Sequence, residues 1–238
     1  MLLSRSHKFI FIKTVKTAGT SVEALLEPLC TPPGHVVDHR NPGIVSEYGV
    51  VGARGRGMDR NAHAYQAHMP ADAIRSAFPE EFATYVKIAN VRNPYDKAVS
   101  HFHMVSGLDV EQAAELARSD VETLQKKFHD HIVQGLPHDK PKLLIDDRLV
   151  VDRIIRFESL LADLERLNAD LNLGLSDIPS SLPTFKMTER AAKGPPVEAY
   201  LGPESIAYIN QRMGWYFDLF DYEMLSLQDA GDRLGNGA

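Results

Sequence analysis

The stretch FIFIKTVKTAGTSVEALL (residues 9–26) joins a β-branched and aromatic run to a helix-forming run through a short loop of small and hydroxyl-bearing residues. The first run predicts a buried strand over Phe9–Lys13. The second run predicts a helix that begins at Thr20 and ends near Leu29. A strand that leads directly into a helix is typical of an α/β fold.

The same alternation continues along the chain. Further strands are predicted at Tyr85–Asn90 and Val150–Phe157. Helices are predicted from their start and stop signals, which are N-cap residues, prolines in first turns and closing glycines. A capping box that begins at Ser119 is one of these start signals. The predicted helices are Met69–Ala77, Asn93–Ser106, Ser119–Gly135, Ser159–Leu171 and Pro203–Phe217. The alternation predicts a P-loop-like parallel sheet flanked by helices on both faces.

Two segments rich in proline and glycine interrupt this order, at Thr31–Asn61 and at Leu182–Pro203. Both are expected to be irregular, and a loop as long as the first one inside a compact domain is usually functional or mobile. The chain length suits one domain over residues 1–229, and the glycine-rich end predicts a flexible tail over residues 230–238.

The composition restricts the class of protein. The chain has 238 residues, a net charge of −6 and 44% hydrophobic residues, which are ordinary values for a globular protein. The acidic balance argues against a nucleic-acid partner, which needs a basic face. Cys30 is the one cysteine, so an internal disulfide is impossible and a cytoplasmic location is expected. The apolar runs are far shorter than the ~20 residues of a transmembrane helix, and the first residues lack a signal-peptide cleavage region.

The loop after the first strand carries the clearest chemistry. The N–H groups at the start of a helix attract anions, and Gly19 permits a close backbone approach. Lys16 adds a positive charge, and the hydroxyl groups of Thr17, Thr20 and Ser21 are hydrogen-bond donors. The loop is not a Walker A loop, because its lysine precedes its glycine. A plain turn with a helix capped by Thr20 is the alternative.

A second strand-to-helix unit lies in YVKIANVRNPYDKAVSHFHM (residues 85–104). Arg92 follows the strand at its carboxyl end, where open parallel sheets bind ligands. The guanidinium group is suited to forked contacts with phosphate, and Ser100 lies about two turns into the helix. The alternative is that Arg92 pairs with a nearby carboxylate such as Asp96 and that Ser100 only packs.

Together, KTAGTS and VRNPYDKAVSHF resemble the sulfotransferase superfamily, and the likeness is to its bacterial and carbohydrate-type branch. The segments HMPADAIR, IIRFESLLADLERL and WYFDLFDY support the likeness over most of the chain. The resemblance implies 3′-phosphoadenosine 5′-phosphosulfate as donor, with its 5′-phosphosulfate on residues 16–21, namely Lys16, Thr17, Ala18, Gly19, Thr20 and Ser21. It also implies that Arg92 and Ser100 bind the 3′-phosphate. Val15 departs from the proline that this branch usually has there.

Sulfuryl transfer requires stabilisation of the leaving oxygen, which the resemblance gives to Lys16, and a base for the acceptor hydroxyl. His68 is the first choice, since it matches the histidine-led segment of the family, and His63 is the second. Capping or packing at the predicted helix Met69–Ala77 is the alternative role for His68. A helix N-terminus would lower the pKa of an adjacent imidazole.

No metal is expected. Histidines two apart on a helix face different directions, so the pairs His101/His103 and His129/His131 are interpreted as packing or surface residues. A late basic loop of the superfamily often closes over the 3′-phosphate, a role that would fall to Lys186, Arg190 and Lys193, although the match is loose and a solvated basic loop is the favoured interpretation for each of them.

Two other functions stay open at this point. A P-loop-type kinase or hydrolase would need a metal-binding carboxylate and a true Gly-Lys-Ser/Thr loop. A non-catalytic protein that binds the donor or its product would show binding without turnover. The acceptor is a small molecule or saccharide of unknown identity, and the segment Thr31–Asn61 is expected to shape its pocket.

Overall fold

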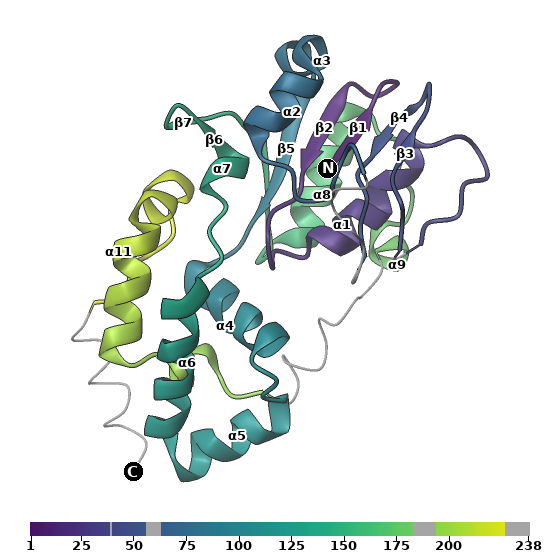
Figure 1. Ribbon diagram of the computed structural model, residues 1–238. Coiled ribbons are helices and arrows are strands. Elements are labelled where there is room, and N and C mark those ends of the chain that lie inside the picture. The colour runs from purple at the N-terminus through teal and green to yellow at the C-terminus, as the bar shows by residue number, and fades with distance from the viewer. Residues whose placement is uncertain (39, 56–62, 183–193, 227–238) are drawn as a thin grey trace. The chain divides into compact units, whose positions relative to one another are not determined.

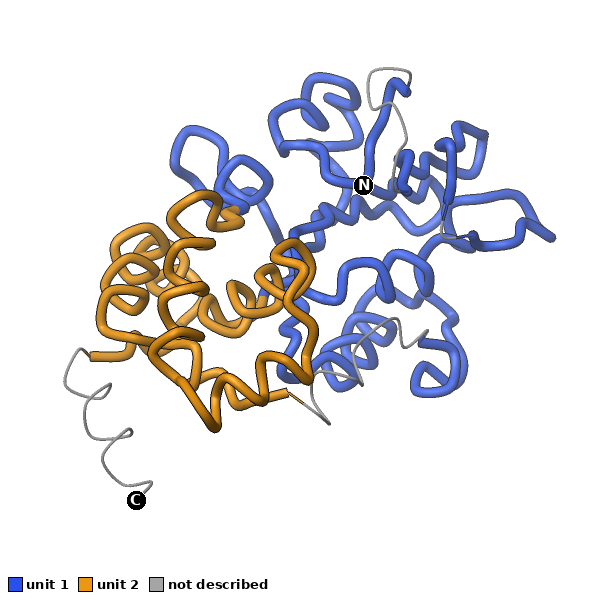
Figure 2. The backbone as a smooth tube through the Cα atoms, turned by 60° about the horizontal axis from the view of Figure 1, so that its bottom comes forward, with its two compact units in different colours: residues 1–91, 139–185 blue, residues 92–138, 186–238 orange. Residues whose placement is uncertain are grey.

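The computed structural model describes residues 1–38, 40–55, 63–182 and 194–226 (Figure 1). The predicted tail, residues 230–238, lies outside the described residues. The chain forms two compact units (Figure 2), and we describe each by itself. Unit 1 comprises residues 1–91 and 139–185, and unit 2 comprises residues 92–138 and 186–238.

Unit 1 is built on a six-stranded sheet in the order β3-β4-β1-β2-β5-β8. The strands are β1 (Leu2–Ser4), β2 (Phe9–Ile12), β3 (Ile44–Val45), β4 (Gly49–Val51), β5 (Val86–Val91) and β8 (Arg153–Arg156). β2 pairs with β5, and β5 with β8, in parallel, with Phe11 opposite Ile88 and Asn90 opposite Ile155. All four residues of β2 are fully buried, which explains why its sequence is continuously apolar.

The prediction of a parallel sheet holds for β2, β5 and β8 and fails for β1, β3 and β4. β1 runs antiparallel to both β2 and β4, and β3 runs antiparallel to β4, so the sheet is mixed. β3 and β4 lie within Thr31–Asn61, which was expected to be irregular. A glycine such as Gly49 suggests a loop, but here the strand pairing itself requires it. A Cβ atom at this position would lie 1.9 Å from the Leu3 carbonyl oxygen.

The described part of unit 1 also contains helices. They are α1 (Gly19–Leu26), the 3₁₀ helix η1 (Glu27–Cys30), α2 (Ala71–Ala77), α3 (Pro79–Thr84), α7 (Lys140–Leu143), α8 (Leu160–Leu171) and α9 (Ile178–Ser181), with a hairpin of β6 (Leu144–Ile145) and β7 (Arg148–Leu149). α8 packs against β8 through a buried face that includes Leu160, Leu164 and Leu167. The leucine spacing in the sequence places Leu161 on the same face, but in the structure it is 44% exposed.

Unit 2 is helical. It contains α4 (Pro94–Val105), α5 (Val110–Ser119), α6 (Val121–Gly135), the 3₁₀ helix η3 (Val197–Tyr200) and α11 (Pro203–Phe220). Its core includes edge-to-face contacts of Phe102 and Tyr200 with Phe128, at centroid distances of 5.7 and 5.9 Å. Within the described part of the chain, no helix has the length and apolar character needed to cross a membrane.

The start of α4 agrees with the prediction, and the start of α6 does not. The Asn93 side chain accepts hydrogen bonds from the N–H groups of Tyr95 and Asp96, as expected for an N-cap. The capping box predicted at Ser119 is wrong, because Ser119 is the last residue of α5 and Asp120 caps α6. The complete capping box lies at Asp109, before α5.

Candidate anion-binding site

The loop between β2 and α1 has an unusual backbone. Lys16 and Ala18 adopt left-handed conformations, with φ of 60° and 61°, which cost non-glycine residues roughly 1–2 kcal/mol each. Turns of this kind can aim successive N–H groups into one anion-binding concavity. Ala18 is the N-cap of α1 and no side chain caps the helix, so Thr20 does not have the capping role of the alternative interpretation. The first N–H groups of α1 therefore have no side-chain cap to compete with an anion.

A chain of hydroxyl groups anchors this loop to β5. The Thr14 hydroxyl donates to the Asn90 carbonyl oxygen at 2.6 Å, and the Thr14 and Thr17 hydroxyl oxygens are 2.7 Å apart. Because Thr14 uses its proton on Asn90, Thr17 is the donor between the two hydroxyls. Thr17 is fully buried, so its hydroxyl holds the loop in place.

Gly19 has a structural reason to be glycine. A Cβ atom at this position would lie 2.9 Å from Cγ of Lys13, whose side chain crosses the start of α1. The Lys13 ammonium then forms a 2.6 Å ion pair with the Glu23 carboxylate, and both side chains are buried. The structure thus gives Gly19 a packing reason against Lys13, and its close approach to an anion stays a prediction.

The ion pair extends into a larger buried network. Arg54 lies 3.8 Å from Glu23 and forms an ion pair with Glu27. The Glu27 carboxylate also contacts His35 at 2.8 Å and accepts a hydrogen bond from Asn41 at 3.1 Å. Sequence reasoning missed this network, although two glutamates on the buried side of a helix beside an apolar strand are a signal of buried ion pairing.

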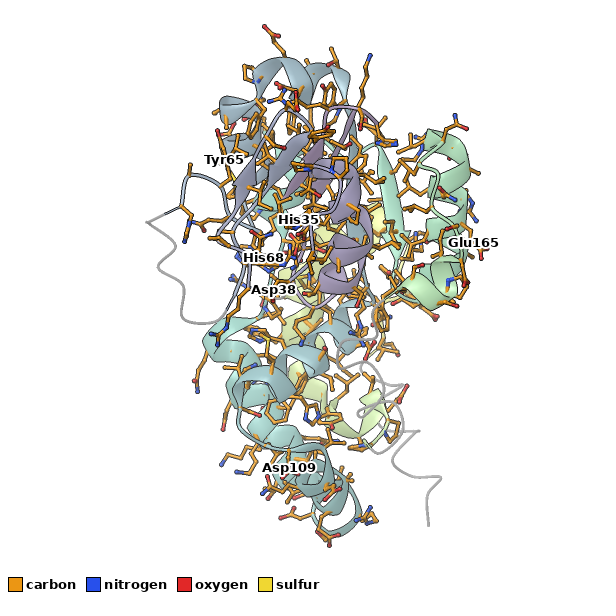
Figure 3. All side chains as sticks on the ribbon, turned by 90° about the vertical axis from the view of Figure 1, so that its right-hand side faces the viewer. His35, Asp38, Tyr65, His68, Asp109 and Glu165 are labelled. Carbon is orange, nitrogen blue, oxygen red and sulfur yellow. The ribbon has the colours of Figure 1, made fainter. Side chains whose placement is uncertain are left out.

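His68 lies against the beginning of the same loop (Figure 3). Its Nδ1 is 3.1 Å from the Lys13 carbonyl oxygen. A carbonyl oxygen only accepts, so Nδ1 carries the proton and Nε2 of the neutral ring keeps its lone pair. His68 does not cap α2, whose N-cap is Pro70.

The pKa of His68 is lowered from 6.5 to about 4. Burial of the ring is the largest cause, although the residue as a whole retains an exposed surface. The positive charge of Lys13 acts in the same direction and that of Lys142 adds to it, against the hydrogen bond to the Lys13 carbonyl. The expected direction is therefore correct, and the cause is burial and lysine charge instead of a helix N-terminus.

Asp139 contacts the other side of the loop. Both of its carboxylate oxygens lie 3.2 Å from the Val15 amide nitrogen, and Oδ1 is 3.0 Å from the Lys142 ammonium. Asp139 is fully buried. Sequence reasoning missed this residue, because no local pattern connects it with a loop that lies 124 positions earlier.

Arg92 and Ser100 belong to unit 2. Arg92 is 7% exposed, and its Nε and Nη2 atoms lie 2.6 and 2.5 Å from Asp96 Oδ2. This is the carboxylate pairing that the sequence offered as the alternative. The Arg92 backbone N–H donates to the Tyr216 hydroxyl, and the Lys97 ammonium lies 5.0 Å from the centre of the Tyr216 ring. Ser100 is half-buried on α4.

The predicted site residues thus fall into two groups. Residues 16–21 and His68 belong to unit 1, together with the half-buried His63, whereas Arg92 and Ser100 belong to unit 2. The late basic residues Lys186, Arg190 and Lys193 lie outside the described residues.

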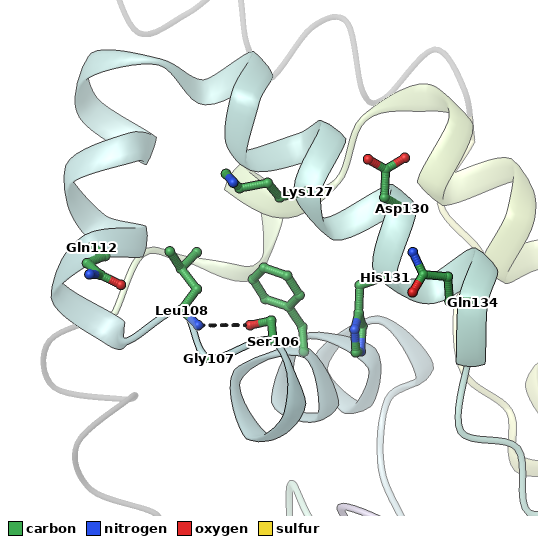
Figure 4. Close-up of a pocket in the computed structure, with 9 residues that line it drawn as sticks. Ser106, Gly107, Leu108, Gln112, Lys127, Asp130, His131 and Gln134 are labelled. Atoms are coloured by element: carbon green, nitrogen blue, oxygen red, sulfur yellow. Dashed lines mark hydrogen bonds between the residues drawn. The ribbon is translucent and has the colours of Figure 1, made fainter.

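Two histidines of α4 contact side chains of other helices. His101 Nδ1 lies 3.0 Å from His131 Nε2, and His103 Nε2 lies 2.6 Å from the Tyr200 hydroxyl. Among the residues that the structure describes, no three His, Cys, Asp or Glu side chains form a group that could hold a metal. His131 also lines an open polar pocket of about 400 Å³ in unit 2, together with Phe102, Lys127 and Gln134 (Figure 4). None of the predicted site residues lines this pocket.

A scan against protein-family models and searches of curated proteins and of solved structures found no match to this chain.

Proposed function

We propose that this protein is a sulfotransferase that moves a sulfuryl group from 3′-phosphoadenosine 5′-phosphosulfate to a hydroxyl or amine of a small-molecule or saccharide acceptor. The observation that carries the proposal is the hydrogen bond between His68 and the Lys13 carbonyl. It brings the candidate base to the first residue of the lysine-bearing loop, 55 positions away in sequence. A cationic loop, an uncapped helix start and a neutral imidazole are the parts that in-line transfer from a phosphosulfate requires.

In this proposal different groups of the chain bind the sulfonate, stabilise the leaving oxygen and accept the acceptor's proton. The N–H groups at the start of α1, with Thr20 and Ser21, hold the sulfonate oxygens, and Thr17 holds the loop. Lys16 stabilises the negative charge on the bridging oxygen as its bond to sulfur breaks. A bond forms between sulfur and the acceptor oxygen, and the acceptor proton passes to Nε2 of His68. The products are the sulfated acceptor and 3′-phosphoadenosine 5′-phosphate.

Arg92 and Ser100 are proposed to bind the 3′-phosphate. Because Arg92 is ion-paired with Asp96, the phosphate would share the guanidinium group with that carboxylate. The proposed fold is P-loop-like in its parallel part, β2–β5–β8, and the proposed location is cytoplasmic, in keeping with the single cysteine.

A kinase or hydrolase is the second candidate, and Asp139 argues against it. Such an enzyme would need a carboxylate beside the phosphate loop to hold a magnesium ion. Asp139 is a carboxylate that contacts this loop, and its oxygens are engaged by the Val15 N–H and the Lys142 ammonium. A non-catalytic donor-binding protein remains the third candidate, and turnover assays separate it from an enzyme.

A thermal-shift comparison of 3′-phosphoadenosine 5′-phosphate with ATP and magnesium tests the donor class. A ligand at 100 times its dissociation constant stabilises the folded state by about 2.7 kcal/mol. We expect a shift with the bisphosphate and a smaller one with ATP and magnesium. A larger shift with ATP and magnesium, or none with the bisphosphate, would refute the proposed donor.

Lys16→Ala and Lys8→Ala form a matched pair for this test. Both lysines have a left-handed backbone, with φ of 60° and 50°, and they flank β2 at its two ends. We expect Lys16→Ala to lose the bisphosphate shift and Lys8→Ala to keep it. Equal shifts in the two variants would show that the loop is not the donor site.

A further inference from the structure

The loop between β2 and α1 is held from two sides. On one side, the hydroxyls of Thr17 and Thr14 connect it to the Asn90 carbonyl. On the other side, both oxygens of the fully buried Asp139 face the Val15 amide nitrogen at 3.2 Å. The second anchor is independent of the first, because it comes from the residue just before α7.

Such a loop needs external anchors. Lys16 and Ala18 are held in left-handed conformations, which persist only where the surroundings impose them. The N–H of the half-buried Val15 precedes the first of these residues, and an N–H left without an acceptor costs at most about 1–3 kcal/mol. An acceptor at Val15 therefore both satisfies this group and fixes where the left-handed turn begins.

A carboxylate beside an anion site would normally repel the anion. Here the Lys142 ammonium lies 3.0 Å from the carboxylate and balances its charge. The positive charge of Lys142 also reaches His68, where it lowers the pKa. Asp139 can thus hold the loop without leaving an uncompensated negative charge next to it.

We infer that Asp139 is a positioning residue, which holds the Lys16–Ala18 turn in its anion-binding conformation through the Val15 N–H. This inference rests on the proposed function, since it assigns the turn to donor binding. It predicts that the contribution of Asp139 to loop order and to bisphosphate binding depends on an acceptor oxygen in the side chain of residue 139. This contribution also depends on a backbone N–H at residue 15.

The test uses Asp139→Asn, Asp139→Ala, Val15→Pro and the double variant Val15→Pro/Asp139→Ala. Asparagine keeps an acceptor oxygen, alanine removes it, and proline removes the N–H while it fixes φ. Asp152→Ala is the matched control, because Asp152 also accepts a backbone N–H, from Lys87 at 2.8 Å, and pairs with the same lysine's ammonium. Hydrogen exchange of the amides of residues 16–19 and calorimetric titration with 3′-phosphoadenosine 5′-phosphate are the two readouts.

We expect Asp139→Ala to accelerate exchange at residues 16–19 by about tenfold or more and to weaken bisphosphate binding about tenfold. Asp139→Asn should stay within about threefold of the wild type, and Val15→Pro should restore most of the binding lost in Asp139→Ala. The Asp152→Ala variant should leave both readouts unchanged.

Each alternative outcome is distinct. Unchanged loop exchange in Asp139→Ala overturns the inference, and so does a loss of binding that Val15→Pro does not restore. If Asp139→Ala fails to fold, Asp139→Asn together with Val15→Pro decides the question by the same two readouts. If the wild type does not bind the bisphosphate, the proposed donor fails, whereas selective exchange at residues 16–19 still decides whether Asp139 holds the turn.

Discussion

Replacing Lys13 by methionine would leave a buried carboxylate without its closest cation. Lys13 is 5% exposed and Glu23 is fully buried, and their charged atoms are 2.6 Å apart. Glu23 Oε1 has no hydrogen-bond partner in the described structure, and the nearest remaining cation in the network, Arg54, is 3.8 Å from Oε2. Breaking a buried ion pair from one side costs about 3–5 kcal/mol. Because Arg54 still compensates in part, we expect Lys13→Met to cost about 3 kcal/mol.

The double variant Lys13→Met/Glu23→Leu isolates the charge from the packing. Methionine preserves most of the stem over Gly19, and leucine removes the unpaired carboxylate. Replacing a buried ion pair with apolar side chains of similar volume is often neutral or stabilising. The double variant should therefore recover about 2 kcal/mol relative to Lys13→Met.

Urea denaturation measured by far-UV circular dichroism is the suitable assay. The single tryptophan, Trp215, lies in unit 2, so its fluorescence does not report directly on the Lys13–Glu23 pair in unit 1. Arg118→Ala is the control, because Arg118 forms an ion pair with Glu115 at 2.8 Å in which both side chains are about two-thirds exposed. It should change stability by less than about 1 kcal/mol. A similar small change in Lys13→Met, or no recovery in the double variant, would refute the assignment of a buried ion pair.

Three further predictions concern the candidate site. Gly19→Ala should destabilise the protein by about 1–3 kcal/mol in denaturant titrations, because the clash with Lys13 outweighs the better helix propensity of alanine; a stabilised variant would contradict this packing. Asp96→Asn should strengthen 3′-phosphoadenosine 5′-phosphate binding about fivefold by calorimetry but leave adenosine 5′-phosphate unchanged, since it removes the carboxylate that competes for Arg92; equal effects on both ligands would oppose the 3′-phosphate role. The folded pKa of His68, about 4, is below its ordinary 6.5, so its contribution to stability is present above pH 6.5 and is lost as the pH falls toward 4. An NMR titration of the imidazole should give this low pKa, and a value near 6.5 would be inconsistent with burial of the ring beside the Lys13 charge.

The elements that could be predicted are those determined by neighbours in sequence. β2 is a continuous apolar run, and α4 begins at Asn93 and Pro94, which together form a local start signal. β1 and β4 could not be predicted in this way. Each has three residues, and each exists because Leu2–Ser4 pairs on one side with β2 and on the other with Gly49–Val51. Pairing between segments so far apart leaves no periodic pattern in a three-residue strand.

The same distinction applies to the candidate site. Lys16 and His68 could be nominated from residue chemistry and resemblance, and the structure places both in unit 1. The packing contacts of Thr17 and Gly19 could not be predicted from sequence, because they arise in the folded loop, with Thr14 and with Lys13. The residue type at a position in a ligand-binding loop can thus be required by the packing that holds the loop, as well as by the ligand.

The electrostatics of unit 1 connect the candidate base with the candidate donor loop. Lys13 and Lys142 are each paired with a buried carboxylate, yet both still lower the pKa of His68. An anion bound at the loop would oppose these charges and raise the pKa of the imidazole toward the neutral range, where a general base is most effective. A weakly basic His68 in the free protein is therefore consistent with a base that gains strength only when a donor anion occupies the loop, because the negative charge of the anion would offset the positive charges of Lys13 and Lys142 that hold the ring neutral beforehand.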